Sequence, residues 1–334
     1  MEGKNADWNN QFVRLRELIA TVPGVPVPRW RTPHPMLQPF RTIEHRLSPN
    51  FQDPNDLLEE LHRALDAGTR AAVISPAAVY GMGGVGKTQL ALRYSHSYRD
   101  RYVGVWWLRA ETPEGLQLDA QALCVAIGVS LSEQVTPTQA LKTWLRGQTA
   151  PWLLVYDNAE NVDALGEHLP DAGPHHVLVT SRNPAWSSLA TPVKTSAWSD
   201  AQGAAFLTQR LARTSAAAAA LPPDLEKLSR ALGGLPLALE QAAGYLEETG
   251  ATPVEYVELI REASQGVALL ETGPVGTGYE HSVIATLSLA FGRLSAAAGQ
   301  LLRLLAFFAP EPVAERLIRK AEKQLVHQHV NNGT

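Results

Sequence analysis

The sequence predicts an α/β protein in which a parallel sheet covered by helices is followed by a wholly helical region. From about residue 73 to residue 194, short apolar segments alternate with helical patterns that start at capping residues. This alternation is typical of a parallel sheet with helices on both faces. After Ser196 the strand-like segments stop, and only helical patterns follow.

The chain before the sheet is expected to be a linker. Six prolines stand between positions 23 and 39, and they exclude regular structure because proline fixes φ and lacks an amide hydrogen. Upstream, Gln11–Ile19 predicts one short helix, and downstream Asp56–Leu65 resumes a helical pattern with leucines on one face. Residues 1–50 are therefore interpreted as a proline-rich linker.

The sheet is expected to contain five strands, at Ala77–Tyr80, Val105–Arg109, Trp152–Tyr156, Val177–Thr180 and, more weakly, near Val193. These segments are apolar throughout because helices cover both faces of such a sheet. Between them, Thr112-Pro113 and Thr136-Pro137 predict helix starts, and Gln139 completes a capping box with Thr136.

The region after the sheet is expected to hold four helices and the start of a further unit. Capping boxes open two of the helices, Ser199 with Gln202 and Thr252 with Glu255. The four helices are expected at 199–213, 222–232, 236–248 and 252–263, and two more at 282–294 and 296–308. The expected domains are therefore residues 1–50, 51–195, 196–275 and 276–334.

Composition indicates a globular protein of a reducing compartment. The net charge of −4 argues against a nucleic-acid partner, which favours a basic face. Cys124 is the single cysteine, which excludes an internal disulfide, and no apolar run is long enough to span a membrane. His175 and His176 are expected to be solvated loop residues. We expect a cytoplasmic protein with no membrane partner.

The segment Gly81-Met82-Gly83-Gly84-Val85-Gly86-Lys87-Thr88 matches G-x-x-x-x-G-K-[ST], a phosphate-binding loop between a strand and a helix. Its glycines let backbone amides converge on phosphate oxygens at a helix N-terminus. Lys87 adds a charge between the β- and γ-phosphates, and the Thr88 hydroxyl is a natural Mg²⁺ ligand. The predicted nucleotide-binding residues are Gly81, Gly83, Gly84, Val85, Gly86, Lys87, Thr88 and Gln89.

The same glycines also satisfy a rival pattern. Gly81, Gly83 and Gly86 fit the G-x-G-x-x-G fingerprint of dinucleotide sites, with Glu111 as the ribose-binding acid. The Lys87-Thr88 pair disfavours this alternative, because the phosphate loop requires it and the dinucleotide site does not.

Two further motifs complete the expected site. Trp152–Asn158 is an apolar strand that ends in an acid, and Asp157 is expected to hold Mg²⁺ with Thr88. Asn158 follows, and its amide can orient a water molecule but cannot take its proton. Arg182 lies after the strand at 177–180, where its guanidinium is expected to sense a γ-phosphate. We therefore predict slow or absent hydrolysis.

Taken in order, these motifs resemble the NB-ARC class of signal-transduction NTPases (STAND), which includes plant resistance proteins and apoptotic-protease activators. The matching segments are Gly81–Thr88, Leu153–Asn158, Val177–Arg182 and Gly234-Leu235-Pro236-Leu237-Ala238-Leu239. The resemblance implies a three-layer P-loop NTPase sheet, a four-helix domain and the truncated start of a winged-helix domain. It also implies that Pro236 packs on adenine, that Arg182 is the sensor, and that ADP or ATP binds with Mg²⁺.

Other segments refine this resemblance. Trp106-Trp107, Pro151-Trp152 and Leu301–Phe307 look like the bacterial branch that often carries tetratricopeptide repeats downstream. Phe51–Asn55 departs from the family pattern, because it lacks the Gly-Arg pair that usually precedes the first helix and contacts the nucleotide.

The leading hypothesis is an ADP/ATP-binding switch with at most slow ATPase activity, which acts through self-association or through effector and sensor proteins. A catalytic P-loop ATPase, kinase or GTPase is one alternative. Asp163–Gly166 matches the D-x-x-G of GTPases, but no N-K-x-D guanine reader occurs. Glu160 and Glu111 are candidates for the general base that is missing after Asp157, but neither lies in a recognisable motif. A degenerate paralogue that acts only as a binding partner is the other alternative.

Overall fold

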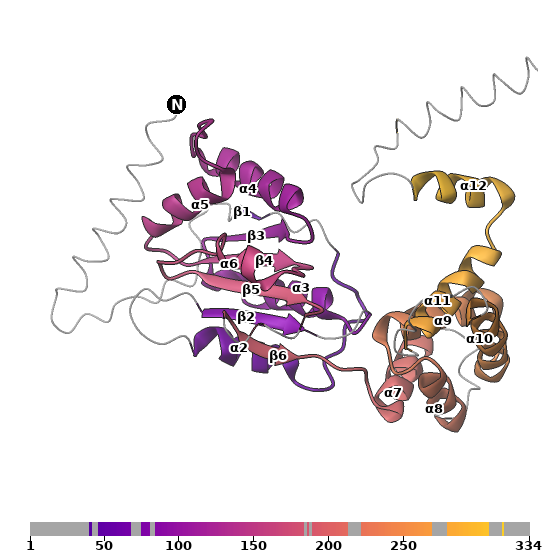
Figure 1. The fold of residues 1–334 in the computed structure, drawn as a ribbon. Coiled ribbons are helices and arrows are strands. Elements are labelled where there is room, and N and C mark those ends of the chain that lie inside the picture. The colour runs from indigo at the N-terminus through magenta and orange to yellow at the C-terminus, as the bar shows by residue number, and fades with distance from the viewer. Residues whose placement is uncertain are drawn as a thin grey trace, which may run out of the picture. The chain divides into compact units, whose positions relative to one another are not determined.

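The chain divides into two compact units, Met1–Ala197 and Trp198–Thr334. The computed structural model in Figure 1 describes residues 40–41, 46–67, 75–80, 84–183, 186, 189–212, 222–268, 279–306 and 316. The first unit contains the sheet, and the second is helical in its described part. No helix among the described residues is long and apolar enough to cross a membrane.

The first unit is built on a six-stranded sheet in which every pairing is parallel. The strand order is β1 (Phe40–Arg41), β3 (Gly104–Arg109), β4 (Trp152–Asp157), β5 (His176–Ser181), β2 (Ser75–Tyr80) and β6 (Thr191–Lys194). All five expected strands are confirmed. The order could not be read from the sequence. It places β5 between β2, which leads into the phosphate-binding loop, and β4, which ends in Asp157.

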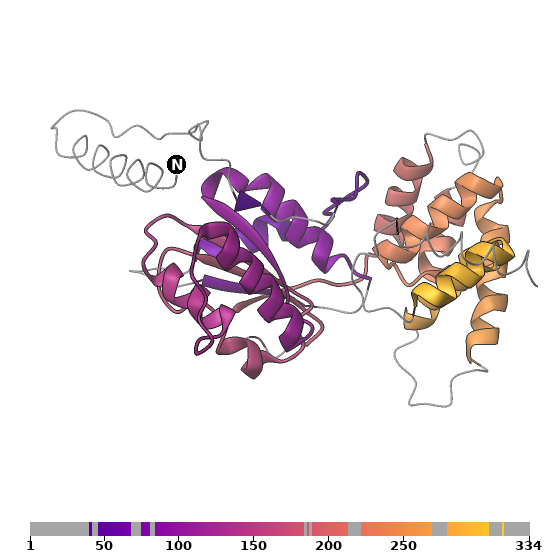
Figure 2. The same ribbon diagram turned by 90° about the horizontal axis from the view of Figure 1, so that it is seen from above.

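Helices cover both faces of the sheet, so the α/β class with three layers is confirmed (Figure 2). On one face, α4 (Pro113–Ile127) and α5 (Pro137–Arg146) pack over side chains such as Trp106, Leu108 and Leu154. On the other, α2 (Leu57–Asp66) and α3 (Lys87–Ser97) pack over Trp107, Leu153 and Val155. Neighbouring residues of β4 thus enter opposite cores, as the alternation of side chains along a strand requires.

The capping residues read from the sequence act as expected. The Thr112 hydroxyl accepts a hydrogen bond from the Gly115 amide at 3.1 Å, and Thr136 and Gln139 form a complete capping box. One cap was not predicted. The Asp53 carboxylate accepts hydrogen bonds from the amides of Leu57 and Leu58, at 2.9 and 2.7 Å. The short helix α6 (Val162–Gly166) was also not predicted.

The interpretation of residues 1–50 as a linker without regular structure is wrong for its last part. Phe40 and Arg41 form β1, which pairs with β3. A strand can follow Pro39 here because an edge strand has only one neighbour and does not need every amide. Leu47 and Phe51 pack against the core beneath α2 and α3. The helix expected at Gln11–Ile19 lies outside the described residues.

The expectation that His175 and His176 are solvated is also wrong. His175 is fully buried: the Trp152 amide donates to its Nδ1 at 3.3 Å, and its Nε2 therefore donates to the Leu145 carbonyl at 2.9 Å. The Tyr102 hydroxyl lies 2.7 Å from Nδ1 of His176. Burial, followed by the nearby charge of Arg101, lowers the pKa of His176 to about 4. His175 is buried and His176 is half-buried because β5 begins at His176 and His175 directly precedes it.

The second unit contains α7 (Asp200–Leu211), α8 (Pro222–Ala231), α9 (Pro236–Thr249), α10 (Pro253–Ala268), α11 (Tyr279–Gly292) and α12 (Ala296–Leu305). All six expected helices are confirmed, as are the capping boxes at Ser199 and Thr252. Helix α11 packs against α9 and α10. Arg210 lies between two carboxylates of α9, those of Glu240 and Glu247. The winged-helix interpretation of residues 276–334 stays a prediction.

The contact between α7 and α8 depends on a glycine. A Cβ added at Gly203 would lie 1.9 Å from Oγ and 2.9 Å from Cβ of Ser229, which is fully buried. We expect Gly203→Ala to destabilise the helical unit by about 1–3 kcal/mol through overpacking. Hydrogen exchange of amides in α7 and α8 measures this, because the two units need not unfold in one step.

Gly244→Ala in α9 is the matched control, since nothing lies within 4 Å of a Cβ added there. This substitution should stabilise the unit by up to about 1 kcal/mol through helix propensity. Equal effects of the two substitutions would contradict the packing argument.

Candidate functional site

The phosphate-binding loop leads into α3 as the sequence predicts. Gly81 and Gly83 lie outside the described residues. Gly84 and Gly86 have positive φ angles of 78° and 92°, and Val85 between them is buried. Nothing lies within 4 Å of a Cβ added at Gly86, so glycine is needed there for its left-handed conformation rather than for space. Lys87 is the first residue of α3, next to the amides that open the helix.

Three side chains from different elements meet at the carboxyl end of the sheet. The Thr88 hydroxyl, on α3, donates a hydrogen bond to Oδ1 of Asp157 at 3.1 Å. The Thr180 hydroxyl, on β5, donates to the same oxygen and accepts a hydrogen bond from the Asn158 amide at 2.9 Å. The strand order explains this meeting, because β5 is the strand between β2 and β4.

This arrangement fits a Mg²⁺ ion. Mg²⁺ favours one or two oxygen ligands from the protein, several waters and the phosphates of a nucleotide. Thr88 and Asp157 are oxygen donors held against each other at the start of α3. The hydroxyl hydrogen of Thr88 is directed to the carboxylate, so its lone pairs stay available to a cation.

The turn after β4 is held in an uncommon conformation. Asn158 has a φ of 60°, one of two non-glycine residues with positive φ in the described chain. Asparagine tolerates this left-handed region better than most residues. The Ala159 amide then donates to the Thr180 carbonyl at 2.9 Å, which ties the turn to β5. The backbone therefore favours asparagine, glycine or aspartate at the position directly after Asp157.

Arg182 stands where the sequence places it, on the loop after β5, and its side chain is exposed. Two contacts join this loop to the one after β4. The Ser181 hydroxyl donates to the Ala159 carbonyl, and the Asn183 side-chain amide donates to the Glu160 carbonyl at 3.1 Å. The two loops thus form one rigid edge that carries both Asp157 and Arg182.

Lys87 and Arg182 place two positive charges close together at this end of the sheet. Burial, followed by the positive charge of Arg182, lowers the pKa of Lys87 to about 8, against weaker opposing effects of Asp157 and Glu160. A phosphate bound here would add negative charge beside Lys87 and would raise this pKa again.

Gln89, predicted to bind nucleotide, has a different set of contacts. Its side-chain oxygen accepts a hydrogen bond from the Ser48 amide at 2.8 Å, and its nitrogen donates to the Arg46 carbonyl at 3.4 Å. Gln89 thus fastens the segment 46–51 to the helix that begins at Lys87. The sequence held no signal for this contact, since Ser48 and Gln89 are 41 positions apart.

Pro236 is the first residue of α9 in the helical unit. The structure shows why its motif, Gly234–Leu239, begins with a glycine. Gly234 has a φ of 62°, and a Cβ added there would lie 2.0 Å from the Trp198 carbonyl oxygen. The Trp198 amide donates to the Gly234 carbonyl at 2.9 Å. The loop before α9 is thereby joined to the first residue of its unit.

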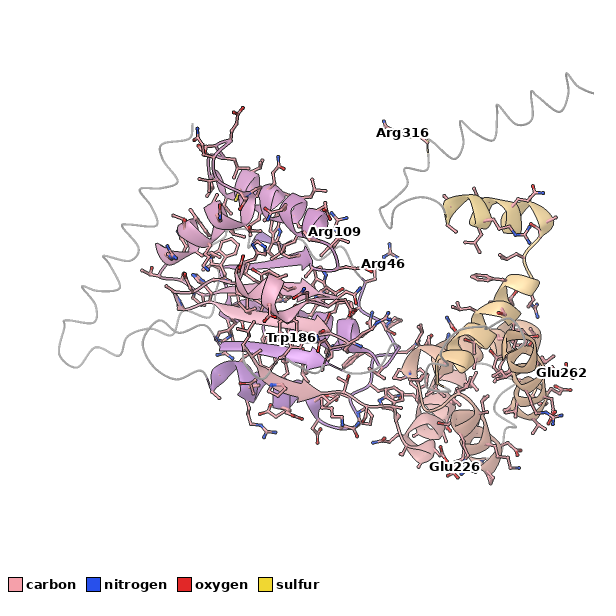
Figure 3. All side chains as sticks on the ribbon, in the orientation of Figure 1. Arg46, Arg109, Trp186, Glu226, Glu262 and Arg316 are labelled. Carbon is pink, nitrogen blue, oxygen red and sulfur yellow. The ribbon has the colours of Figure 1, made fainter. Side chains whose placement is uncertain are left out.

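Arg109 is a residue at this edge that the sequence did not indicate. It ends β3, in register with Asp157, and Figure 3 shows it near the same end of the sheet as Arg46. The Asp119 carboxylate of α4 accepts hydrogen bonds from the Arg109 amide at 2.7 Å and from its Nη2 at 2.8 Å. No sign of this pair is visible in the sequence, because an arginine and an aspartate ten positions apart form no known motif.

Comparisons with known proteins give distant matches in sequence and in structure. No family model matches the chain. A nucleotide-binding leucine-rich repeat (NLR)-like protein of Hyaloscypha variabilis is 26% identical over 211 residues, which cover 56% of this chain. The chain spans about a fifth of that relative's length, since the match covers 21% of it.

Solved structures with a similar fold include Cdc6p from Pyrobaculum aerophilum, with 14% identity, a TM-score of 0.44 and coverage of 79% of this chain and 87% of that one. The Aeropyrum pernix ORC1 protein in complex with DNA has 18% identity and a TM-score of 0.40, over 84% and 79% of the two chains. Drosophila ORC bound to DNA has 13% identity and a TM-score of 0.42, over 89% and 90%. At these values the likenesses carry no argument about function.

The conformation of Asn158 predicts which substitutions it tolerates. Asn158→Gly should leave stability nearly unchanged, whereas Asn158→Ala should cost about 1–2 kcal/mol, because alanine is strained at positive φ. Urea denaturation of both variants measures the difference. Equal losses would mean that the side-chain amide, and not the backbone, holds the turn.

The lowered pKa of Lys87 predicts a pH dependence of phosphate binding. Below about pH 8 the free protein already carries the proton, so affinity should be flat; above it, binding must take up a proton and affinity should fall by up to about tenfold per pH unit. Calorimetry with ADP in buffers of different ionisation enthalpy counts that proton. The uptake should grow between about pH 7 and about pH 8.5, and a constant value near zero would exclude Lys87 as the titrating group.

Proposed function

We propose that the chain is an adenine-nucleotide-binding switch module of the NB-ARC class, which binds ADP or ATP with Mg²⁺ and hydrolyses ATP slowly or not at all. The observation that carries the proposal is the hydrogen bond between Thr88 and Asp157, which brings the two expected Mg²⁺ ligands together beside Lys87. The bound Mg²⁺ would neutralise phosphate charge. The loop amides and Lys87 would hold the phosphates themselves.

The adenine part of the proposal rests on the resemblance to the NB-ARC class. Pro236 begins α9 after a left-handed glycine, so its ring has a fixed place in the helical unit. We propose that this ring packs on the adenine base.

A switch of this kind needs a large difference in nucleotide affinity between its two states. Moving an equilibrium from about 1:99 to about 99:1 takes about 5.5 kcal/mol. Charge-assisted hydrogen bonds contribute roughly 1.5–3 kcal/mol each. Lys87 and Arg182 are near enough for their charges to interact, so together they supply enough donors to distinguish a γ-phosphate from its absence. Self-association, or binding of effector and sensor proteins, would then follow the nucleotide state.

Slow hydrolysis follows from the position after Asp157. The side chain of Asn158 has no basic group, and its left-handed backbone would strain a glutamate placed there. Water activation would therefore lack a general base at the position where such a base is expected. A nucleotide that persists for long is what a switch requires.

Lys87→Met tests the binding proposal. Saturating nucleotide at about 100 times its Kd should stabilise the wild-type protein by about 2.7 kcal/mol, and the substitution should abolish this. The nucleotide-free variant should be as stable as wild type or slightly more so. The reason is that a folded-state pKa of about 8, below the unfolded value, makes the charged lysine unfavourable to folding at all pH values below about 8.

Thermal unfolding with and without ADP and Mg²⁺ makes both measurements. Lys227→Met is the control, because Lys227 is an exposed residue of the helical unit that contacts Asp224; it should keep the full nucleotide effect. Absence of any nucleotide effect in the folded wild-type protein would refute the proposal. An ATP turnover above roughly 1 s⁻¹ would instead favour a catalytic P-loop enzyme.

A further inference from the structure

We propose that the outer face of α4 is a docking surface for the segment 11–19 of the same chain, which covers this face as an amphipathic helix. Three features of the first unit carry the proposal: the place of its exposed apolar side chains, the edge at which β1 joins the sheet, and the distribution of charge. The docking goes beyond the proposed nucleotide binding and does not depend on it.

The exposed apolar side chains of the first unit gather on one side of the sheet. Val125 of α4 is 70% exposed and Leu118 of the same helix is 51% exposed. Single exposed apolar residues that are scattered over a surface need no explanation, but a set confined to one part of it indicates a contact surface. Among the described residues of this unit, the large apolar side chains that are exposed all lie between positions 103 and 135, namely Val103, Leu118, Val125 and Val135.

Helix α4 is apolar on two sides. Leu118, Ala122 and Val125 stand at positions i, i+4 and i+7, so they share its outer face, and all three are exposed. A helix at the surface normally carries polar residues on its outer face, and one that is apolar all round is normally buried. The inner face is buried against the sheet through Leu116, Ala120, Leu123 and Cys124.

The chain enters the sheet at the edge that α4 covers. Strand β1 is the outermost strand, next to β3, and Phe40 is paired with Gly104 at the beginning of β3 (Figure 1). Helix α4 runs back toward that end of the strand, because Asp119 in its first half binds Arg109 at the end of β3. Val125 therefore lies toward the end of the sheet at which the residues before β1 arrive.

The segment 11–19 has a pattern that fits such a face. Phe12, Leu15, Leu18 and Ile19 share one side of the helix that its sequence predicts. The residues from 20 to 39 separate this segment from β1. In a polyproline conformation they would span about 60 Å, whereas α4 is only about 22 Å long. The connection is therefore long enough for the segment to reach every part of α4.

Charge and tethering favour this segment over a second copy of the chain. Between positions 110 and 136 the chain has four acidic residues, three of them exposed, and no lysine or arginine. Residues 11–31 instead contain four arginines and a single acid, Glu17. A tether of this kind holds the segment at an effective concentration on the order of 1 mM. A second copy meets the same face only at the concentration of the protein itself.

Thiol modification of the full chain without nucleotide tests the docking. Val125→Cys places a thiol on the outer face of α4. Arg63→Cys is the matched control, because the Arg63 side chain of α2 is also 70% exposed and α2 covers the other face of the sheet. The native Cys124 is fully buried, so wild type gives the background rate. We expect a maleimide to modify Val125→Cys about tenfold more slowly than Arg63→Cys, because the docked segment covers the first thiol.

Release of the segment should remove this protection. The pair Leu15→Glu and Leu18→Glu places charge on the apolar side of the segment, so it should accelerate modification of Val125→Cys about tenfold and leave Arg63→Cys unchanged. Leu118→Glu on α4 should have the same effect as the pair. Combined with the pair, it should have no further effect, because both changes disrupt one contact.

Two results would overturn the inference. Equal modification rates of Val125→Cys and Arg63→Cys, in chains with no other substitution, would show that the face is uncovered. Protection that survives the changes in segment 11–19, or that grows with protein concentration, would show that a second copy or another element covers it. If Leu118→Glu disturbs the circular dichroism of the folded chain, Ala122→Glu carries the same expectation on the same face. Because no nucleotide enters the measurement, this inference and the proposed function fail separately.

Discussion

The candidate site depends on one constraint, the placement of β5 between the strand that leads into the phosphate-binding loop and the strand that ends in Asp157. Parallel strands in this order bring their carboxyl ends to one edge, where three segments distant in sequence meet. The Asp157 carboxylate is the point of contact, because hydroxyls from α3 and from β5 both donate to it. If β2 and β5 were not neighbours, the Thr88 hydroxyl would lose its hydrogen-bond partner, the Asp157 carboxylate.

Two residues at this edge are expected to serve nucleotide binding although they lower the stability of the free protein. Lys87 is partly buried beside the charge of Arg182, and burial followed by that charge lowers its pKa to about 8. The strain at Asn158 is a second local cost. Both costs fall on residues at the carboxyl end of the sheet, whereas the cores on either face of the sheet are built from buried apolar side chains. Binding of an anion would relieve the first cost, which is why a nucleotide should stabilise this fold strongly.

Most of the fold could be predicted from the sequence, because its signals are local. The apolar strands, the proline-started helices and the capping boxes at Thr136, Ser199 and Thr252 each depend on residues within a few positions of one another. The errors arose where distant segments decide the outcome. Composition alone made 1–50 a linker, but the neighbouring edge of β3 and the amide of Gln89 hold its last residues in place. His175 was read as solvated because its partners, Trp152 and Leu145, are far away in sequence.

The site divides in the same way. The phosphate-binding loop, Asp157 and Arg182 were found because a motif records their spacing, while Thr180 and Arg109 were not singled out because their contacts depend on strand order.

The connection between the units also depends on strand order. Lys194, the last residue of β6, pairs with Tyr80 directly before the phosphate-binding loop. Only residues 195–197 then separate it from Trp198, whose amide binds Gly234 in the loop before Pro236. The strand that leads into the phosphate-binding loop and the loop before Pro236 are thus linked by one strand pairing, three residues and one hydrogen bond, and no sequence motif records this link.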